Sequence, residues 1–311
     1  MAWEDNLKDV EFRNNVTHQL QQMPGILYPL AGSKGNGAGK SEVKIEDRFG
    51  QMTLRKKTAQ NGDTDHSDFD AIRRFVKKPG SYDDAILIAR DQANSTSVAV
   101  GSPAVVAAAN AIRKYHDDMF LKGWWGSAWQ GVETATQEIA FTAGNKVAVD
   151  FDNSSTPIGL TLAKLIELDR LLGEANIDVE AEQPIILVDA GARSNLFKIP
   201  EYINADFQEG RPLVRGELKP FMNFRFMKAN LGSTAAYPES AGLFKPSTVN
   251  RLPVIIPSGV HHEVWVESFV RVTAEMPTKK HSMQIYVEAE SATVRTDEAK
   301  AWFIETKPVG S

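Results

Sequence analysis

The segment that decides the fold reads SPAVVAAANAIRKYHDDMFLKG and spans residues 102–123. Ser102 can cap a helix, and Pro103 can occupy its first position without losing a needed hydrogen bond. Apolar and aromatic side chains then recur every three or four residues, as on one helix face: Val105, Val106, Ala109, Ile112, His116, Met119 and Phe120. Gly123 can provide a left-handed stop. The pattern predicts a helix of roughly 30 Å.

A second face of this predicted helix carries only small side chains. They are Ala104, Ala107, Ala108 and Ala111. Because alanine lets another backbone come close, we expect a sheet or a partner chain to lie against this face.

The residues before the helix predict an extended arm and not a globular domain. Up to residue 100, short apolar clusters alternate with stretches rich in Gly, Lys and Asp. Such a segment offers too little apolar surface to offset the entropy of ordering it. We therefore expect it to become ordered only by lying across other copies of the chain.

Two parts of this arm resemble the legs of an open hairpin. They span residues 43–58 and 69–78, with Gly62 and several Asp residues at the tip. Legs of a dozen residues would reach on the order of 40 Å. An isolated ribbon of that length is marginal in water, so it needs a surface to lie on.

The residues after the helix predict a body of mixed helices and strands. Residues 161–172 form an amphipathic pattern with Leu162, Leu165, Ile166 and Leu172 facing inward. Residues 192–199 suggest a third helix. The expected strands span residues 185–188, 222–226, 254–256, 264–272, 284–290 and 301–306. The fold class is therefore α+β.

Composition excludes several classes of protein. The 311 residues, 42% hydrophobic and 24% charged, are typical of a soluble protein large enough for two cores. The chain has neither an apolar run of about eighteen residues nor a signal-peptide pattern, so we expect no membrane contact. With Cys at 0 and a net charge of -5, nothing depends on disulfides, and the surface as a whole does not favour phosphate. Folding in a reducing cytoplasm fits these features.

No motif in the chain predicts catalysis, a cofactor or a metal site. Residues 35–41 resemble a phosphate-binding loop, but Lys34 stands where its first Gly is needed, so a flexible hinge explains these glycines better. Residues 63–74 open like a calcium loop and then depart from it at Asp68 and Arg74. His261 and His262 are adjacent in an expected strand, so they point to opposite faces.

Basic and aromatic pairs supply the candidates for contacts between subunits. The basic pairs fall mostly in the arm and are either solvated charges or partners of acidic patches on another copy. The paired tryptophans could stack on a base or sugar, but we expect them to anchor a core or an interface. The candidates are Arg55, Lys56, Lys57, Arg73, Arg74, Trp124 and Trp125.

The order of these segments resembles the major capsid proteins of tailed double-stranded DNA bacteriophages, with the fold typified by phage Hong Kong 97. None of the resembling passages is a catalytic signature, and together they cover most of the chain from about residue 44 onward. The passages are RRFVKKPGSYDDAILIAR at 73–90, SPAVVAAANAI at 102–112, GLTLAKLIELDRLLG at 159–173, RGELKPFMNFRF at 215–226 and IYVEAESATVRTDEAK at 285–300.

The resemblance implies a domain organisation. Residues 1–42 would be an N-terminal arm and residues 43–78 an extended loop, both draped over adjacent subunits. Residues 79–158 and 271–311 would form a peripheral domain with the long helix as its spine. Residues 159–270 would form an axial α/β domain.

The resemblance also implies a function. The chain would be a non-enzymatic major capsid protein that assembles, in the host cytoplasm, into hexamers and pentamers of an icosahedral head shell in the virion. Its partners would be other copies of itself, portal proteins and scaffolding or decoration proteins, with DNA enclosed without sequence-specific binding. The alternatives are a soluble α/β hydrolase or transferase with a disordered N-terminal tail, and a nucleic-acid-binding module that uses the basic arm.

Overall fold

The computed structural model describes most of the chain outside its N-terminus and the tip of the expected hairpin. The described residues are 25–49, 54, 56, 71–89, 101–132, 135–153, 156–203, 218–234, 237–246 and 248–308. The fold is α+β, as the sequence predicts, and its strands form three sheets. Within the described part, no helix is both long enough and apolar enough to span a bilayer.

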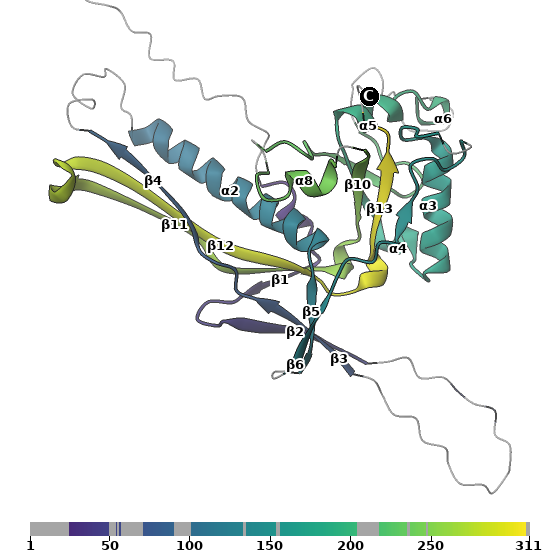
Figure 1. The fold of residues 1–311 in the computed structure, drawn as a ribbon, viewed down its shortest axis with the longest axis horizontal. Coiled ribbons are helices and arrows are strands. Elements are labelled where there is room, and N and C mark those ends of the chain that lie inside the picture. The colour runs from purple at the N-terminus through teal and green to yellow at the C-terminus, as the bar shows by residue number, and fades with distance from the viewer. Residues whose placement is uncertain are drawn as a thin grey trace, which may run out of the picture.

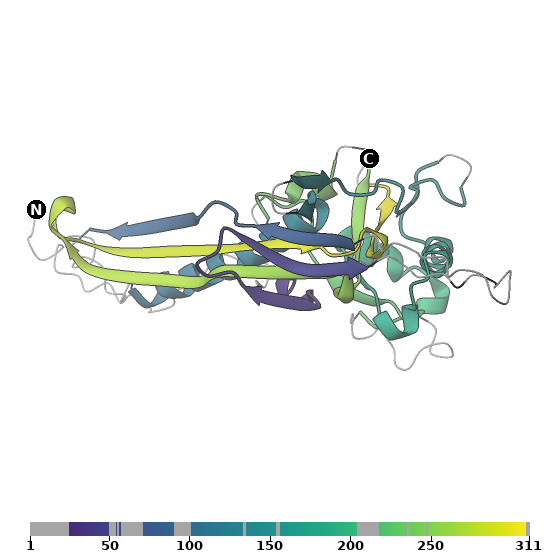
Figure 2. The same ribbon diagram turned by 90° about the horizontal axis from the view of Figure 1, so that it is seen from below.

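A long four-stranded sheet forms one end of the molecule (Figures 1 and 2). Its order is β1 (Ser33–Asn36), β11 (Val260–Met276), β12 (Ser282–Arg295) and β4 (Tyr82–Ile88). β1 runs parallel to β11, and the other pairs are antiparallel. Helix α2 (Gly101–Trp125) lies along this sheet, mainly over β12.

A five-stranded sheet forms the other end. Its order is β7 (Lys146–Val147), β13 (Ala301–Thr306), β10 (Asn250–Ile255), β8 (Ile185–Val188) and β9 (Arg225–Lys228). Short and medium helices surround it: α3 (Leu162–Glu174), α4 (Val179–Glu182), α5 (Ala190–Leu196), α6 (Pro200–Ile203) and α8 (Ala241–Phe244). Single 3₁₀ turns span Tyr28–Leu30, Pro257–Gly259, Pro277–Lys279 and Glu298–Lys300.

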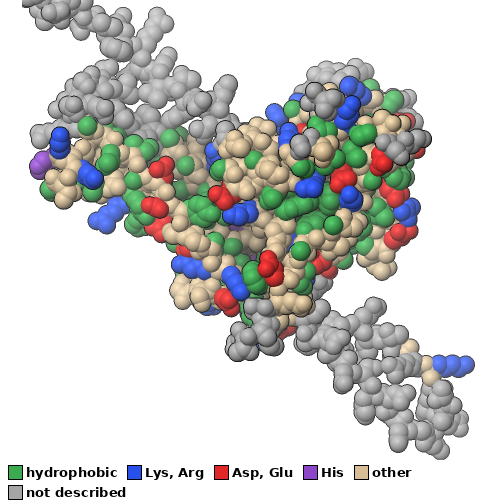
Figure 3. All heavy atoms as spheres, in the orientation of Figure 1, with side chains coloured by type: hydrophobic (Ala, Val, Ile, Leu, Met, Phe, Trp, Pro, Cys, Tyr) green, Lys and Arg blue, Asp and Glu red, His purple; other side chains and the backbone are tan. Residues whose placement is uncertain are grey.

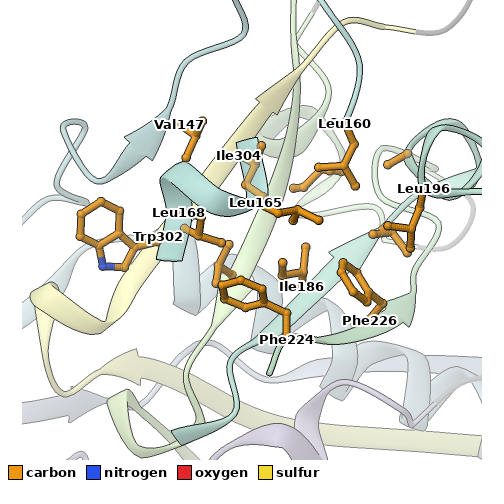
Figure 4. Packing of buried hydrophobic residues seen from close by; sticks show 14 of the residues in the cluster. Val147, Leu160, Leu165, Leu168, Ile186, Leu196, Phe224, Phe226, Trp302 and Ile304 are labelled. Carbon is orange, nitrogen blue, oxygen red and sulfur yellow. The ribbon is translucent and has the colours of Figure 1, made fainter. Parts of the chain in front are cut away.

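The largest core lies between this sheet and α3 (Figure 4). Leu165 and Leu168 of α3 meet Ile186 of β8 and Ile304 of β13, and all four side chains are buried. The two outer faces of the sheet are both covered, which explains why β8 is a continuous apolar run.

A third sheet lies below the junction of the two larger ones (Figure 1). Its order is β2 (Glu42–Phe49), β3 (Ala71–Lys77), β5 (Ala128–Val132) and β6 (Ala135–Ile139). β2 and β3 are antiparallel and form the legs of the hairpin that the sequence predicts. The hairpin is attached to the body because Val76 packs with Ala128, Trp265 and Val294.

Two predicted details of the helices are wrong. α2 does not end at Gly123 but continues to Trp125. Gly123 instead lets the helix lie close to β12, since a Cβ there would lie 2.2 Å from the Thr293 carbonyl oxygen. In α3, Ile166 is 52% exposed, and Leu168 takes the inward position. Thr161 caps α3 as its N-cap, and its hydroxyl accepts the Lys164 amide.

The strand expected over residues 222–226 is shorter in the structure. Met222 and Asn223 have φ angles of 51° and 61°, so they form a tight turn that Phe221 and Phe224 close. β9 begins only at Arg225. The alternating apolar residues at 222–226 therefore belong to a turn followed by the start of a strand, and not to one continuous strand.

The first hundred residues are not ordered by other copies alone. Residues 25–36 pack on α2 and β11 of the same chain, where Leu27 is completely buried. β4 pairs with β12 along seven residues. The expectation of an arm shaped only by its neighbours is therefore wrong for these segments, because their partners lie far away in the same sequence.

The boundary that the resemblance implies between residues 270 and 271 falls inside β11. This strand is continuous from Val260 to Met276 and pairs with β12. β13, on the C-terminal side of that boundary, pairs with β10 in the five-stranded sheet.

Candidate assembly surfaces

An apolar groove runs between α2 and β4. Two adjoining hollows of about 120 Å³ and 210 Å³ share Asp84, Ala111 and Val287 in their walls. The groove exists because the predicted small-residue face of α2 lies on the sheet: Ala108 is buried there, and Ala107 and Ala111 leave the space beside it open.

Large apolar side chains remain exposed around this groove. Tyr82 and Ile86, which line it, are 37% and 41% exposed. Asp83 and Asp84, also exposed, add negative charge at the start of β4. An exposed edge strand with apolar side chains is a surface to which another chain can bind.

The described parts of the hairpin expose an apolar and a basic side chain, whereas the groove is apolar and edged by acidic side chains. Leu54 is 93% exposed, and Lys56 is exposed two residues further on. Nearer the body, Arg73 donates to Asp47 at 2.7 Å across the two legs. Hydrogen bonds from Lys44 and Arg73 lower the pKa of the Asp47 carboxyl.

Two of the candidate contact residues are buried inside their own chain, so we withdraw them. The Arg74 side chain is 5% exposed and forms an ion pair with Glu298 at 3.4 Å. Trp124 is completely buried in a core with Phe120 and Phe244. Both side chains therefore form contacts within one subunit: Arg74 with Glu298, and Trp124 with the surrounding core.

The other candidates are divided. Trp125 is half-buried and stacks on Phe141 at a ring distance of 4.6 Å, so most of its surface is used within the chain. Arg73 and Lys56 are accessible and remain predicted contact residues. Arg55 and Lys57 lie outside the described residues, as does the calcium-like stretch up to Asp70.

Asp117 attaches the N-terminal segment to α2. Its two carboxylate oxygens accept the backbone amides of Gly25, Ile26, Leu27 and Tyr28, at 2.8–3.1 Å. Burial raises the pKa of this carboxyl, and the four amides oppose the rise. The adjacent Asp118 accepts the amides of Glu239 and Ser240, so consecutive carboxylates hold two distant loops.

Arg295 joins β12 to the end of α2. It is completely buried, donates to the Trp124 carbonyl at 2.6 Å and to the Gly126 carbonyl, and pairs with Glu298 at 2.8 Å. A cation is favourable at a helix C-terminus, where carbonyl groups lack helical partners. Arg295, Asp117 and Asp118 could not be singled out from the sequence, because their partners are mostly backbone groups, which have no sequence signature.

Lys164 has a similar role in the other end of the molecule. Its ammonium donates to the carbonyls of Val149, Ile158 and Glu305, at 2.8–3.1 Å. Burial lowers the pKa of Lys164 to about 8. The arrangement satisfies three carbonyls and is structural.

The histidines point to opposite faces of β11, as predicted. His262 faces α2 and forms a hydrogen bond with the Thr293 hydroxyl. The ring centroids of His262 and His116 lie 6.0 Å apart. His261 lies on the other face with Glu263. Among the described residues, no group of three His, Asp or Glu side chains could hold a metal ion.

The glycines of residues 35–37 serve packing and not a hinge. A Cβ on Gly35 would lie 2.0 Å from a Glu263 carboxylate oxygen, and one on Gly37 would lie 2.6 Å from the Trp265 ring. Both glycines therefore let β1 and the following turn lie close to β11. This correction also removes the basis for a nucleotide loop.

The chain as a whole matches a known protein family. A family model described as phage capsid protein matches residues 5–307. The chain belongs to the phage capsid protein family. A search of curated protein sequences found no match.

Solved structures of phage capsids have the same fold as this capsid protein. The capsid of cyanophage P-SCSP1u has a TM-score of 0.70 at 11% identity, over 99% of this chain and 94% of that chain. Cyanophage Pam1 gives 0.70 at 11% identity, over 100% and 99%. Mycobacterium phage Che8 gives 0.64 at 12% identity, over 96% and 97%. The fold is thus the Hong Kong 97-type capsid fold that the resemblance implies.

Family and fold together identify a major capsid protein that forms the phage head shell. The hydrolase or transferase hypothesis is not favoured.

Proposed function

We propose that this capsid protein builds an icosahedral shell as hexamers and pentamers, held by contacts between unlike surfaces of neighbouring copies. The observation that carries the proposal is that one molecule presents two unlike exposed surfaces: a basic and apolar hairpin, at Leu54 and Lys56, and an apolar groove edged by Asp84. A surface that fits a different surface of the next copy generates rings when the rotation closes.

Each subunit would then contribute two arms and two domains. The arms are residues 1–42 and 43–78, of which residues 25–42 also lie on their own body. We place the peripheral domain on the long sheet with α2 and the axial domain on the five-stranded sheet. This division moves the C-terminal boundary from residue 270 to the turn at Pro257–Gly259 and assigns β13 to the axial domain.

The proposed role is structural and needs no catalytic step. On the face seen in Figure 3, Lys and Arg side chains are interspersed with Asp and Glu, and the net charge is -5. This distribution supports enclosure of DNA without sequence-specific binding. Portal and scaffolding or decoration proteins would complete the particle, which would assemble in the host cytoplasm.

A charge-reversal pair tests the proposed contact. Asp84→Lys and Lys56→Glu should each abolish closed particles, because each replaces an attraction with a like-charge repulsion. The double variant should restore particles in negative-stain electron microscopy. Asp169→Lys, on the exposed face of α3, is the matched control and should assemble normally. Normal particles from both single variants would refute this contact.

A further inference from the structure

Three side chains on one face of the long sheet form a chain of hydrogen bonds. Ser33 of β1 and His261 of β11 are directly paired in the register of the two strands. Ser33 Oγ lies 2.7 Å from His261 Nδ1, and His261 Nε2 lies 2.7 Å from Glu263 Oε2. The serine, imidazole and carboxylate thus follow one another as in hydrolytic triads, with the roles of the two ring nitrogens exchanged.

The chemistry of the carboxylate fixes the direction of these bonds. An ionised Glu263 can only accept, so the proton of the neutral imidazole lies on Nε2. Nδ1 then carries the lone pair and accepts the Ser33 hydroxyl proton. His261 is therefore held in the tautomer that a general base for Ser33 needs.

The serine of this chain is accessible to solvent, whereas the imidazole and the carboxylate are buried. Ser33 is exposed, whereas His261 and Glu263 are 6% and 1% exposed. Glu263 Oε1 has no hydrogen-bond partner among the described residues, so His261 is the side chain through which this carboxylate is satisfied. Gly35 leaves the space that the carboxylate occupies, since a Cβ there would lie 2.0 Å from Glu263 Oε2.

We propose that Ser33 is a nucleophile that accepts acyl groups from activated esters, with His261 as its general base and Glu263 as the positioning residue. Ser33 Oγ attacks the ester carbonyl while its proton passes to His261 Nδ1. The Glu263 carboxylate stabilises the imidazolium that forms. The bond to the leaving alcohol then breaks, and the alcohol takes the proton from Nδ1. The products are an acylated Ser33 and the free alcohol.

The test is acetylation of the full-length protein by p-nitrophenyl acetate, with the modified serine identified by peptide mass spectrometry. Ser33 should be acetylated much faster than Ser81, which is also exposed but donates to Glu288 and has no histidine partner. Ser33→Ala should remove the fast phase of p-nitrophenol release. His261→Ala should slow acetylation of Ser33 by about 10²-fold or more.

Two further measurements separate a chemical role from a structural one. Free imidazole should restore acetylation of Ser33 in His261→Ala, which no repair of packing would do. Glu263→Gln should slow the reaction in the wild-type background but have no further effect in His261→Ala, because the two residues act as a unit.

Two outcomes would overturn the proposal. One is acetylation of Ser33 in the folded wild-type protein at the rate of Ser81, or none at all. The other is equal rates in wild type and His261→Ala. Either result would leave the three residues as a hydrogen-bonded attachment of β1 to β11.

Discussion

Buried charged side chains connect distant segments of this subunit through hydrogen bonds to the backbone. Asp117, Arg295 and Lys164 each bind several backbone groups of distant segments. A buried charge is tolerated only when it is well hydrogen-bonded, and removing its bonds leaves buried polar groups unsatisfied. These residues should therefore matter more for stability than the exposed ion pairs of the surface.

Asp117→Asn tests this at the N-terminal segment. The neutral amide has one acceptor oxygen in place of two and loses charge-assisted bonds to the amides of Gly25–Tyr28. We expect the free energy of unfolding to fall by about 2 kcal/mol in urea denaturation, with faster proteolysis before residue 30. Asp169→Asn, exposed on α3, should change neither. Equal stability of the two variants would contradict the anchoring role.

His262→Gln tests the effect of pH. Burial lowers the pKa of His262 from 6.5 to about 3. Between these values the unfolded chain binds a proton that the folded chain does not, so the free energy of unfolding falls as the pH decreases. The contribution is about 1.4 kcal/mol per pH unit inside this window.

Urea unfolding of both proteins at several pH values from 7 to about 4 is the measurement. The wild type should lose more stability than His262→Gln as the pH falls, since glutamine does not titrate. Parallel pH dependences would show that His262 is not held neutral by the fold.

At the scale of elements, the close contact between α2 and β12 defines the elongated end of the subunit. At Gly123 the two elements come close together, and the missing Cβ makes room for the Thr293 carbonyl. Helix propensity alone favours alanine over glycine by about 1 kcal/mol. The structure predicts the opposite sign at this position.

A pair of substitutions separates the two effects. Gly123→Ala should lower the free energy of unfolding by about 1–3 kcal/mol, because it forces the α2 and β12 backbones apart. Gly173→Ala in α3, where a Cβ meets nothing within 4 Å, should raise it by up to about 1 kcal/mol. Thermal or urea unfolding of both variants decides the matter, and stabilisation by both would contradict the contact.

The elements with a strong local period were predictable from the sequence. α2 and α3 follow from apolar residues at every third or fourth position, β8 from a short apolar run, and the legs of the hairpin from the Gly and Asp residues at its tip. That residues 25–36 adopt a fixed structure on their own chain was not predictable. The amides of Leu27 and its neighbours donate to Asp117 of α2, about 90 residues away in the sequence. The burial of Arg74 likewise depends on Glu298, which no local pattern connects to it.

The candidate contact surfaces were predictable only in part. Paired basic residues in the hairpin fitted either solvated charges or contacts with another copy, and the groove proposed to receive them depends on how β4 lies beside α2. Trp124 and Trp125 looked equivalent in the sequence, and only the direction of each side chain on α2 divides core from surface.

The whole molecule combines packed sheets with apolar and charged side chains that stay exposed among the described residues. The long sheet with α2 extends from one side of the five-stranded sheet, and the hairpin leaves the body near their junction (Figure 1). Weak contacts made to several neighbours at once can produce a stable assembly. A single copy in solution would leave those surfaces exposed to water.

The size of what the purified full-length protein forms is the most direct test of this account. Mass photometry and negative-stain electron microscopy across a range of concentrations should reveal capsomer rings or closed shells that grow at the expense of single subunits. A monodisperse monomer at every concentration, with the groove between α2 and β4 exposed and the hairpin unengaged, would contradict the account.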